Sequence, residues 1–171
     1  MHVLVNGVRL FFDVEGSCLV TDGPAMREKP TLVLLHGGPG MDHSGYKPRF
    51  SQLADIAQVV FLDHRGNGRS DPGPRESWTL AQWGDDVHAF CEVLGISHPI
   101  VMGASFGGVV ALAYATRHPA HPAKLILVST VAAGGAHFEE RIALFERLGG
   151  PEVGALARRR FIDGQVDPAM L

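Results

Sequence analysis

The serine with the most distinctive surroundings is Ser105, which lies in the sequence Gly-Ala-Ser-Phe-Gly at positions 103–107. This G-x-S-x-G pattern follows an apolar run at 99–102 and precedes a helix-like segment at 106–117. A serine on so tight a strand-to-helix turn adopts a strained backbone, and the flanking glycines let strand and helix approach each other. Because the hydroxyl then projects from the sheet, the pattern predicts that Ser105 is a catalytic nucleophile.

A serine directly before a helix also has a simpler interpretation. It can be an N-cap residue followed by small packing residues, here Gly107 and Gly108. The preceding strand and a second glycine-rich motif favour the nucleophile.

The second motif is His-Gly-Gly-Pro-Gly at positions 36–40, directly after the apolar run 31–35. Acyl transfer turns a carbonyl oxygen into an oxyanion, and deleting one preorganised donor to it costs roughly 3–4 kcal/mol. We assign the two donors of this oxyanion hole to the backbone N–H groups of Gly38 and Phe106. A plain turn with a structural histidine is the alternative. A phosphate loop is disfavoured because the motif lacks the P-loop lysine and the G-x-G-x-x-G spacing.

The elements that must position these motifs alternate between strand-like and helix-like patterns. Such alternation predicts an α/β fold with a mainly parallel, doubly wound sheet whose carboxyl ends carry the function. Asn6-Gly7 predicts a β-hairpin in front of this sheet, and residues 15–30 read as a polar loop. The expected elements are hairpin strands 3–5 and 8–14, strands 31–35, 58–63, 99–102 and 124–129, and helices 46–55, 79–94 and 106–117.

Three motifs together resemble the α/β-hydrolase superfamily: HGGPG at 36–40, DHRGNGRSD at 63–71 and GASFGG at 103–108. Their order and spacing agree with it across residues 31–130. Within the superfamily, the motifs are similar to those of proline iminopeptidase-like serine peptidases. Those peptidases usually carry Gly-Gly-Ser-Trp-Gly at the elbow, from which Ala104 and Phe106 depart.

The sequence Asp63-His64-Arg65 raises two further alternatives, a charge-relay pair and metal ligation. Neighbouring residues at a strand end point in different directions, and no third ligand stands at a metal spacing, so we expect no metal site. The resemblance implies a structural turn in which Arg65 pairs with Asp63, with Ser70 near the mouth of the pocket.

The remaining histidines offer no obvious general base. The resemblance implies that His36 is structural, beneath the oxyanion loop. His43 and His137 are placed so that each could approach the pocket, at most to contact substrate. The others are expected on crossover helices or in turns beside prolines: His88, His98, His118 and His121.

The triad acid and histidine are not found in this chain. In this fold they follow the serine in the order acid, then histidine. The strand 124–129 ends without a carboxylate, and later acidic residues are spaced like solvent-facing positions: Glu139, Glu140, Asp163 and Asp167.

The domain boundary is expected near residue 133, with 1–133 as the N-terminal part of the hydrolase core. Residues 134–171 contain helix patterns at 137–148 and 152–162 and resemble the beginning of a helical lid. The C-terminal part of the hydrolase fold is then incomplete. The apolar stripe Ile142, Leu144, Phe145 and Leu148 is interpreted as packing.

The composition and net charge limit the classes of partner that the protein is expected to bind. The 171 residues carry a net charge of −3, so nucleic acid and anionic membranes lack a basic surface to bind. The N-terminus lacks signal-peptide features, which predicts a cytoplasmic protein, and Cys18 and Cys91 are expected to be free thiols. A small-molecule or short-peptide substrate fits best, with no cofactor, and the oligomeric state is left open.

The predicted function is therefore that of a serine hydrolase that cleaves a small ester or amide. The resemblance points to N-terminal prolyl peptide bonds. A carboxylic-ester hydrolase is one alternative. A catalytically inactive hydrolase fragment or binding module is the other, because fold does not guarantee function.

Overall fold

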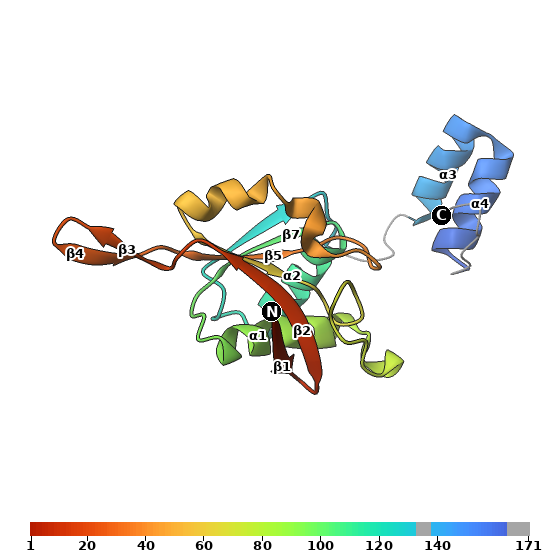
Figure 1. Cartoon of the computed structure of the whole chain (residues 1–171). Helices are drawn as coiled ribbons and strands as arrows, with labels where there is room; N and C mark the ends of the chain where they lie inside the picture. Colours follow the sequence, from red (N-terminus) through yellow and green to blue (C-terminus); the bar gives the residue numbers. More distant parts are fainter. Residues whose placement is uncertain (133–137, 164–171) are drawn as a thin grey trace. The chain divides into compact units, whose positions relative to one another are not determined.

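The computed structural model describes residues 1–132 and 138–163 (Figure 1). The chain divides into two compact units, Met1–Ala132 and Ala133–Leu171. No helix in the described ranges is both long and apolar enough to cross a membrane.

The first unit is built on a six-stranded sheet with the order β1-β2-β6-β5-β7-β8. The first two strands form the hairpin expected around Asn6-Gly7, and β2 continues antiparallel to β6. All later pairs are parallel. The strands are β1 His2–Val5, β2 Val8–Glu15, β5 Thr31–Leu35, β6 Gln58–Leu62, β7 Ile100–Ala104 and β8 Lys124–Val128.

The register of the parallel strands brings the two glycine-rich motifs together. Leu35 at the end of β5 pairs with Gly103 near the end of β7. Because both strands run in the same direction, the loop after β5 and the turn after β7 leave the same edge of the sheet. The predicted, mainly parallel sheet is confirmed, and both glycine-rich motifs follow the carboxyl ends of its strands.

One prediction for the N-terminal region is wrong. Residues 15–30 contain a second, two-stranded hairpin, β3 Leu19–Asp22 and β4 Ala25–Glu28, rather than a loop throughout. Its turn contains Gly23, whose φ of +59° favours glycine. The strands are almost wholly exposed, so they bury no face and show no hydrophobic alternation.

The two faces of the sheet are covered differently. Helices α1 Leu80–Val93 and α2 Phe106–Arg117 pack together over one face (Figure 1). Aromatic and aliphatic residues from the segment between β5 and β6 cover part of the other. That segment, expected as one helix over 46–55, forms 3₁₀ turns at His43–Tyr46 and Phe50–Asp55, and a third lies at Arg75–Ser77.

The described part of the second unit consists of two helices, α3 Phe138–Gly149 and α4 Pro151–Phe161, joined at Gly150. They pack on each other through buried Ile142 and Ala157. Leu148, which belongs to the expected apolar stripe, is 76% exposed, so only part of that stripe is buried.

Candidate active site

Ser105 lies at the junction between β7 and α2 in a backbone conformation that L-residues rarely adopt. Its φ is +51° and its ψ is −116°. Its amide N donates to Val128 O at 2.9 Å, and its carbonyl accepts from Thr130 Oγ1 at 2.7 Å, so neighbouring β8 holds the turn. The side chain makes no helix-capping hydrogen bond, and the residue is exposed. Ser105 is thus not a side-chain cap, and its hydroxyl is available for chemistry.

The flanking glycines explain the spacing of the motif. A Cβ on Gly103 would overlap the backbone of Gly107, and a Cβ on Gly107 would overlap the carbonyl of Leu35. Backbone atoms of three elements meet here without intervening side chains. Only glycine at both positions allows the helix to begin this close to the sheet.

His36 supports the loop after β5 as a structural residue. It is 2% exposed; Nδ1 donates to Gly37 O at 2.7 Å, and Nε2 accepts from the backbone N–H of His64 at 3.1 Å. Both ring nitrogens are therefore occupied, which fixes one neutral tautomer. Burial lowers the pKa of His36 below its ordinary value. The ring cannot accept a proton from Ser105 without breaking this support.

A cavity of about 280 Å³ joins Ser105 to the loop after β5. Gly38 lines it, whereas Phe106 does not: the Phe106 ring packs edge-on against His64 and Trp83. The backbone N–H groups of Gly38 and Phe106 donate to no group in the described part of the chain. Phe106 also opens α2, whose N-terminus favours negative charge.

His43 lies outside this cavity. It is 1% exposed, its Nδ1 lies 2.7 Å from Oδ1 of Asp63, and its Nε2 lies 3.4 Å from Oδ2 of Asp13. Its ring also stacks on Phe11. The structure therefore places His43 in a buried polar cluster outside the cavity lining. His137 lies outside the described residues.

The expected pairing of Arg65 with Asp63 is wrong. Arg65 pairs with Asp86 of α1 at 2.7 Å, while the Asp63 carboxylate accepts from His43 and from the backbone N–H of Arg69. Strand β6 ends at Leu62, so both residues lie in the turn that follows, where the alternation of a strand no longer sets the side-chain directions. A buried-face aspartate within the apolar pattern of α1 was the signal for the true partner.

Ser70 does not lie at the pocket mouth as expected. It is 8% exposed, its Oγ donates to Asp63 O at 2.6 Å, and it accepts from the backbone N–H of Phe11 at 2.8 Å. It ties the turn after β6 to β2.

Two polar side chains of the cavity lining, Asp42 and Tyr46, were not singled out from the sequence. Asp42 is the acidic residue of the cavity lining, and hydrogen bonds from Ser44 lower its pKa, so it is ionised at neutral pH. Tyr46 also lines the cavity, and its hydroxyl donates to Leu35 O at 2.8 Å. The signal was the Asp-x-Ser pattern, which caps the first 3₁₀ turn.

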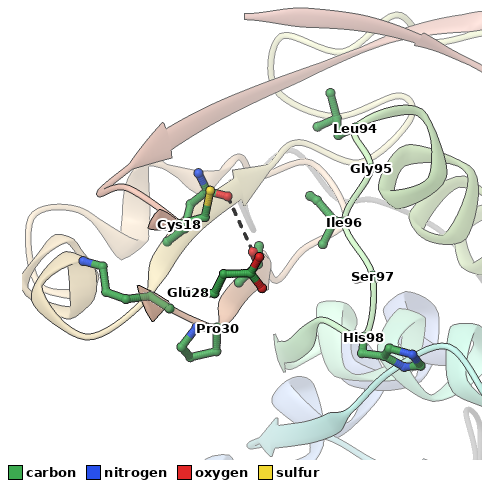
Figure 2. A pocket seen from close by; sticks show the side chains of 11 residues that line it. Cys18, Glu28, Pro30, Leu94, Gly95, Ile96, Ser97 and His98 are labelled. Carbon is green, nitrogen blue, oxygen red and sulfur yellow. Dashed lines mark hydrogen bonds between the residues drawn. The ribbon is translucent and has the colours of Figure 1, made fainter. Parts of the chain in front are cut away.

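A larger cavity, of about 460 Å³, lies away from Ser105. Figure 2 shows Cys18, Glu28 and Pro30 facing the turn 94–98 across it. Both cysteines are free; Cys18 is exposed, and burial raises the pKa of Cys91 to about 12, which leaves it an inert thiol. Nothing in this lining resembles a nucleophile with its base.

The sequence profile of the alpha/beta hydrolase fold matches residues 30–159, a range that contains both motifs of the cavity. The chain belongs to the α/β-hydrolase family. It is 31% identical over 165 residues to a proline iminopeptidase of Thermoplasma volcanium, covering 94% of this chain and 51% of that protein. The chain thus spans about half the length of the curated relatives it matches.

Solved structures of hydrolases show the same fold. The proline iminopeptidase of Mycobacterium smegmatis superposes with a TM-score of 0.74 at 27% identity, over 98% of this chain and 56% of that one. A thermophilic esterase from Thermogutta terrifontis superposes with a TM-score of 0.66 at 29% identity, over 88% of this chain and 55% of that one. The similarity spans peptidases and esterases.

Proposed function

We propose that the protein is a serine hydrolase in which Ser105 is the nucleophile and the N–H groups of Gly38 and Phe106 form the oxyanion hole. The observation that carries the proposal is the strained, uncapped backbone of Ser105 between β7 and α2, on a cavity that Gly38 also lines. The family membership supports the same reaction class.

In this mechanism Ser105 Oγ attacks the carbonyl carbon of the substrate. The carbonyl π bond opens, and the resulting oxyanion accepts hydrogen bonds from the two backbone donors, with the α2 N-terminus adding favourable potential. A base takes the serine proton and passes it to the leaving amine or alcohol, which departs and leaves an acyl-enzyme. Water then hydrolyses the acyl-enzyme by the reverse proton path.

The base and its acid are assigned to the half of the family fold that this chain does not span. Ser105 Oγ makes no hydrogen bond to any described residue, and the histidine of the cavity, His36, has both nitrogens occupied. In this fold both groups follow the serine in chain order. Within the same proposal, residues 134–171 are the beginning of a helical lid.

For the substrate we propose an N-terminal prolyl peptide. Asp42 gives the cavity a negative charge that favours a protonated amino terminus. A carboxylic ester is the second candidate, because Met41, Tyr46 and backbone glycines make most of the remaining lining apolar or neutral.

The experiment uses a protein that includes the remaining half of the hydrolase fold. A fluorophosphonate probe should label it, and Ser105→Ala should abolish labelling, whereas Ser97→Ala, an exposed serine in the turn before β7, should not. Labelling that persists in Ser105→Ala identifies another nucleophile. No labelling of the parent protein supports a non-catalytic binding module.

Substrate class is tested on the same protein with prolyl and butyryl chromogenic substrates. Prolyl preference supports the peptidase. Rapid ester turnover without prolyl cleavage contradicts it. Residues 1–171 alone should turn over roughly 10⁴–10⁶ times more slowly than the longer protein, as triad deletions do.

A further inference from the structure

Three side chains with metal-ligand chemistry meet far from Ser105. His88 and Glu92 are one turn apart on α1, so they share a helix face. His121 comes from the turn between α2 and β8. One ligand atom of each residue lies within 4.8 Å of the other two. Crossover helices return to the amino ends of parallel strands, so this cluster lies at the sheet edge opposite the proposed nucleophile.

The His121 ring is held from one side by a buried tyrosine. Its Nδ1 is hydrogen-bonded to the hydroxyl of Tyr114, a fully buried residue. Its Nε2 is buried and has no hydrogen-bond partner in the described part of the chain. A buried polar atom without a partner destabilises the fold. His121 Nε2 is therefore available to bind a ligand that the described residues do not supply.

The missing ligand is best explained as a cation. When Nδ1–H donates to the tyrosine oxygen, Nε2 presents a lone pair. That lone pair lies 3.3 Å from Oε1 of Glu92, a contact that is not a hydrogen bond. Two electron-rich atoms this close repel unless a positive charge lies beside both.

The distance fits adjacent ligands of one ion. With metal–ligand bonds of about 2.0–2.1 Å, two ligand atoms of a tetrahedral Zn²⁺ ion lie about 3.3–3.4 Å apart. The His121–Glu92 separation of 3.3 Å matches this edge. His88 meets the His121 ring at a centroid distance of 4.6 Å and makes no hydrogen bond to any described residue. Its ligand atom lies within 4.8 Å of those of Glu92 and His121.

The described neighbours of His88 position its ring but form no hydrogen bonds with its nitrogens. Its face stacks on the His118 ring at a centroid distance of 3.9 Å. His118 itself is held by Asp85, with Nε2 2.8 Å from Oδ1, and Asp85 also pairs with Arg117. The charges around the cluster are therefore already balanced, and the Glu92 carboxylate remains for a cation.

We propose that His88, Glu92 and His121 bind a divalent transition-metal ion of the Zn²⁺ type, with water completing the coordination. Two imidazoles and one carboxylate suit Zn²⁺, whereas Mg²⁺ and Ca²⁺ prefer oxygen ligands throughout. An adjoining cavity of about 190 Å³, lined by both Glu92 and His121, leaves room for water. It shares the turn 95–98 with the larger cavity, and Figure 2 shows His98 at the end of that turn. The ion links α1 to the α2–β8 connection.

Zinc titration of the tag-free 171-residue chain at pH 7.5, followed by calorimetry, tests the site. We expect one saturable Zn²⁺ per chain, a higher Tm with Zn²⁺ and no such effect of Mg²⁺. His88→Ala and Glu92→Gln should each weaken Zn²⁺ binding about tenfold or more. Glu92 is 62% exposed, so its substitution leaves the fold intact. The matched controls His2→Ala and Glu76→Gln, both at exposed positions, should bind like the parent chain.

Two further readouts separate ligation from a purely structural role. Tyr114→Phe keeps the buried ring but removes the partner of His121 Nδ1, so it should weaken Zn²⁺ binding about 10- to 100-fold. With Cu²⁺, nitrogen hyperfine splitting in the electron paramagnetic resonance spectrum should report two imidazoles, and one in His88→Ala. Absence of saturable binding, or binding that His88→Ala and Glu92→Gln leave unchanged, overturns the proposal.

Discussion

Arg65 and Asp86 form a buried bidentate pair, with Nε 2.7 Å from Oδ2 and Nη2 2.8 Å from Oδ1. Both side chains are only 3% exposed. Asn6 Nδ2 and Gln82 Nε2 also donate to Asp86 Oδ1, each at 2.9 Å. The carboxylate thus ties helix α1 to the first hairpin and to the turn after β6, which carries the family motif.

Asp86→Asn should therefore destabilise the fold strongly. The substitution preserves shape but leaves the Arg65 charge buried without its counterion, which costs about 3–5 kcal/mol. Urea unfolding measures the loss. Asp71→Asn is the matched control, because its pair with Arg9 has the same fork geometry on the surface, where solvent screens it. Similar losses in the two variants contradict the argument.

Lowering the pH should begin to destabilise the fold at a higher pH than the one at which carboxylates become protonated. Burial lowers the pKa of both His36 and His64 below the ordinary 6.5, most strongly for His64. The unfolded chain then takes up protons first, so this stability is complete above pH 6.5 and is lost as the pH falls below it. Each such histidine contributes a slope of up to about 1.4 kcal/mol per pH unit.

Urea midpoints between pH 7.5 and 5.5 measure this slope. His64→Gln should make it shallower, and substitution of the exposed His2 by Gln should not. Stability that stays constant over the interval shows that the histidines titrate equally in both states.

Asp42→Asn should separate binding of the two substrate classes in the longer protein. Asparagine keeps the shape of the side chain but removes the charge that favours a protonated amino terminus. The KM for a prolyl substrate should rise about tenfold, equivalent to about 1.4 kcal/mol, while KM for a neutral butyryl ester stays unchanged. Asp55→Asn, at an exposed position, is the control. Equal effects on both substrates remove Asp42 from amine recognition.

Features formed by residues close together in the chain could be predicted from the sequence, whereas contacts between distant segments could not. The strand-to-helix turn at Ser105 was predictable because its strand, glycines and helix are neighbours in the chain. The Asp86 partner of Arg65 comes from another element, as does His121 of the histidine cluster. The spacing of residues along the sequence does not indicate such contacts between different elements. The hairpin at Asp22-Gly23 is local in the sequence, but it was missed because its strands bury no face and show no periodic hydrophobic pattern.

The exposed edge of β8 should make the 171-residue chain self-associate when it is studied alone. In the described sheet β8 pairs only with β7. Its residues Ile126, Leu127 and Val128 are 44%, 43% and 38% exposed. An apolar edge with unpaired backbone groups is a template for pairing with another chain. Light scattering after size-exclusion chromatography should show oligomers that grow with concentration.

A charge on that edge should reverse the association, because a lysine there disfavours strand pairing between chains. Leu127→Lys should shift the chain towards monomer. Leu148→Lys is the matched control, since Leu148 is 76% exposed but lies on helix α3. Equal effects of the two lysines point to general apolar stickiness and not to edge pairing. A parent chain that stays monomeric at every concentration contradicts the prediction outright. In a longer protein whose further strands pair with β8, the Leu127 substitution should instead destabilise the fold, because the same edge is then buried.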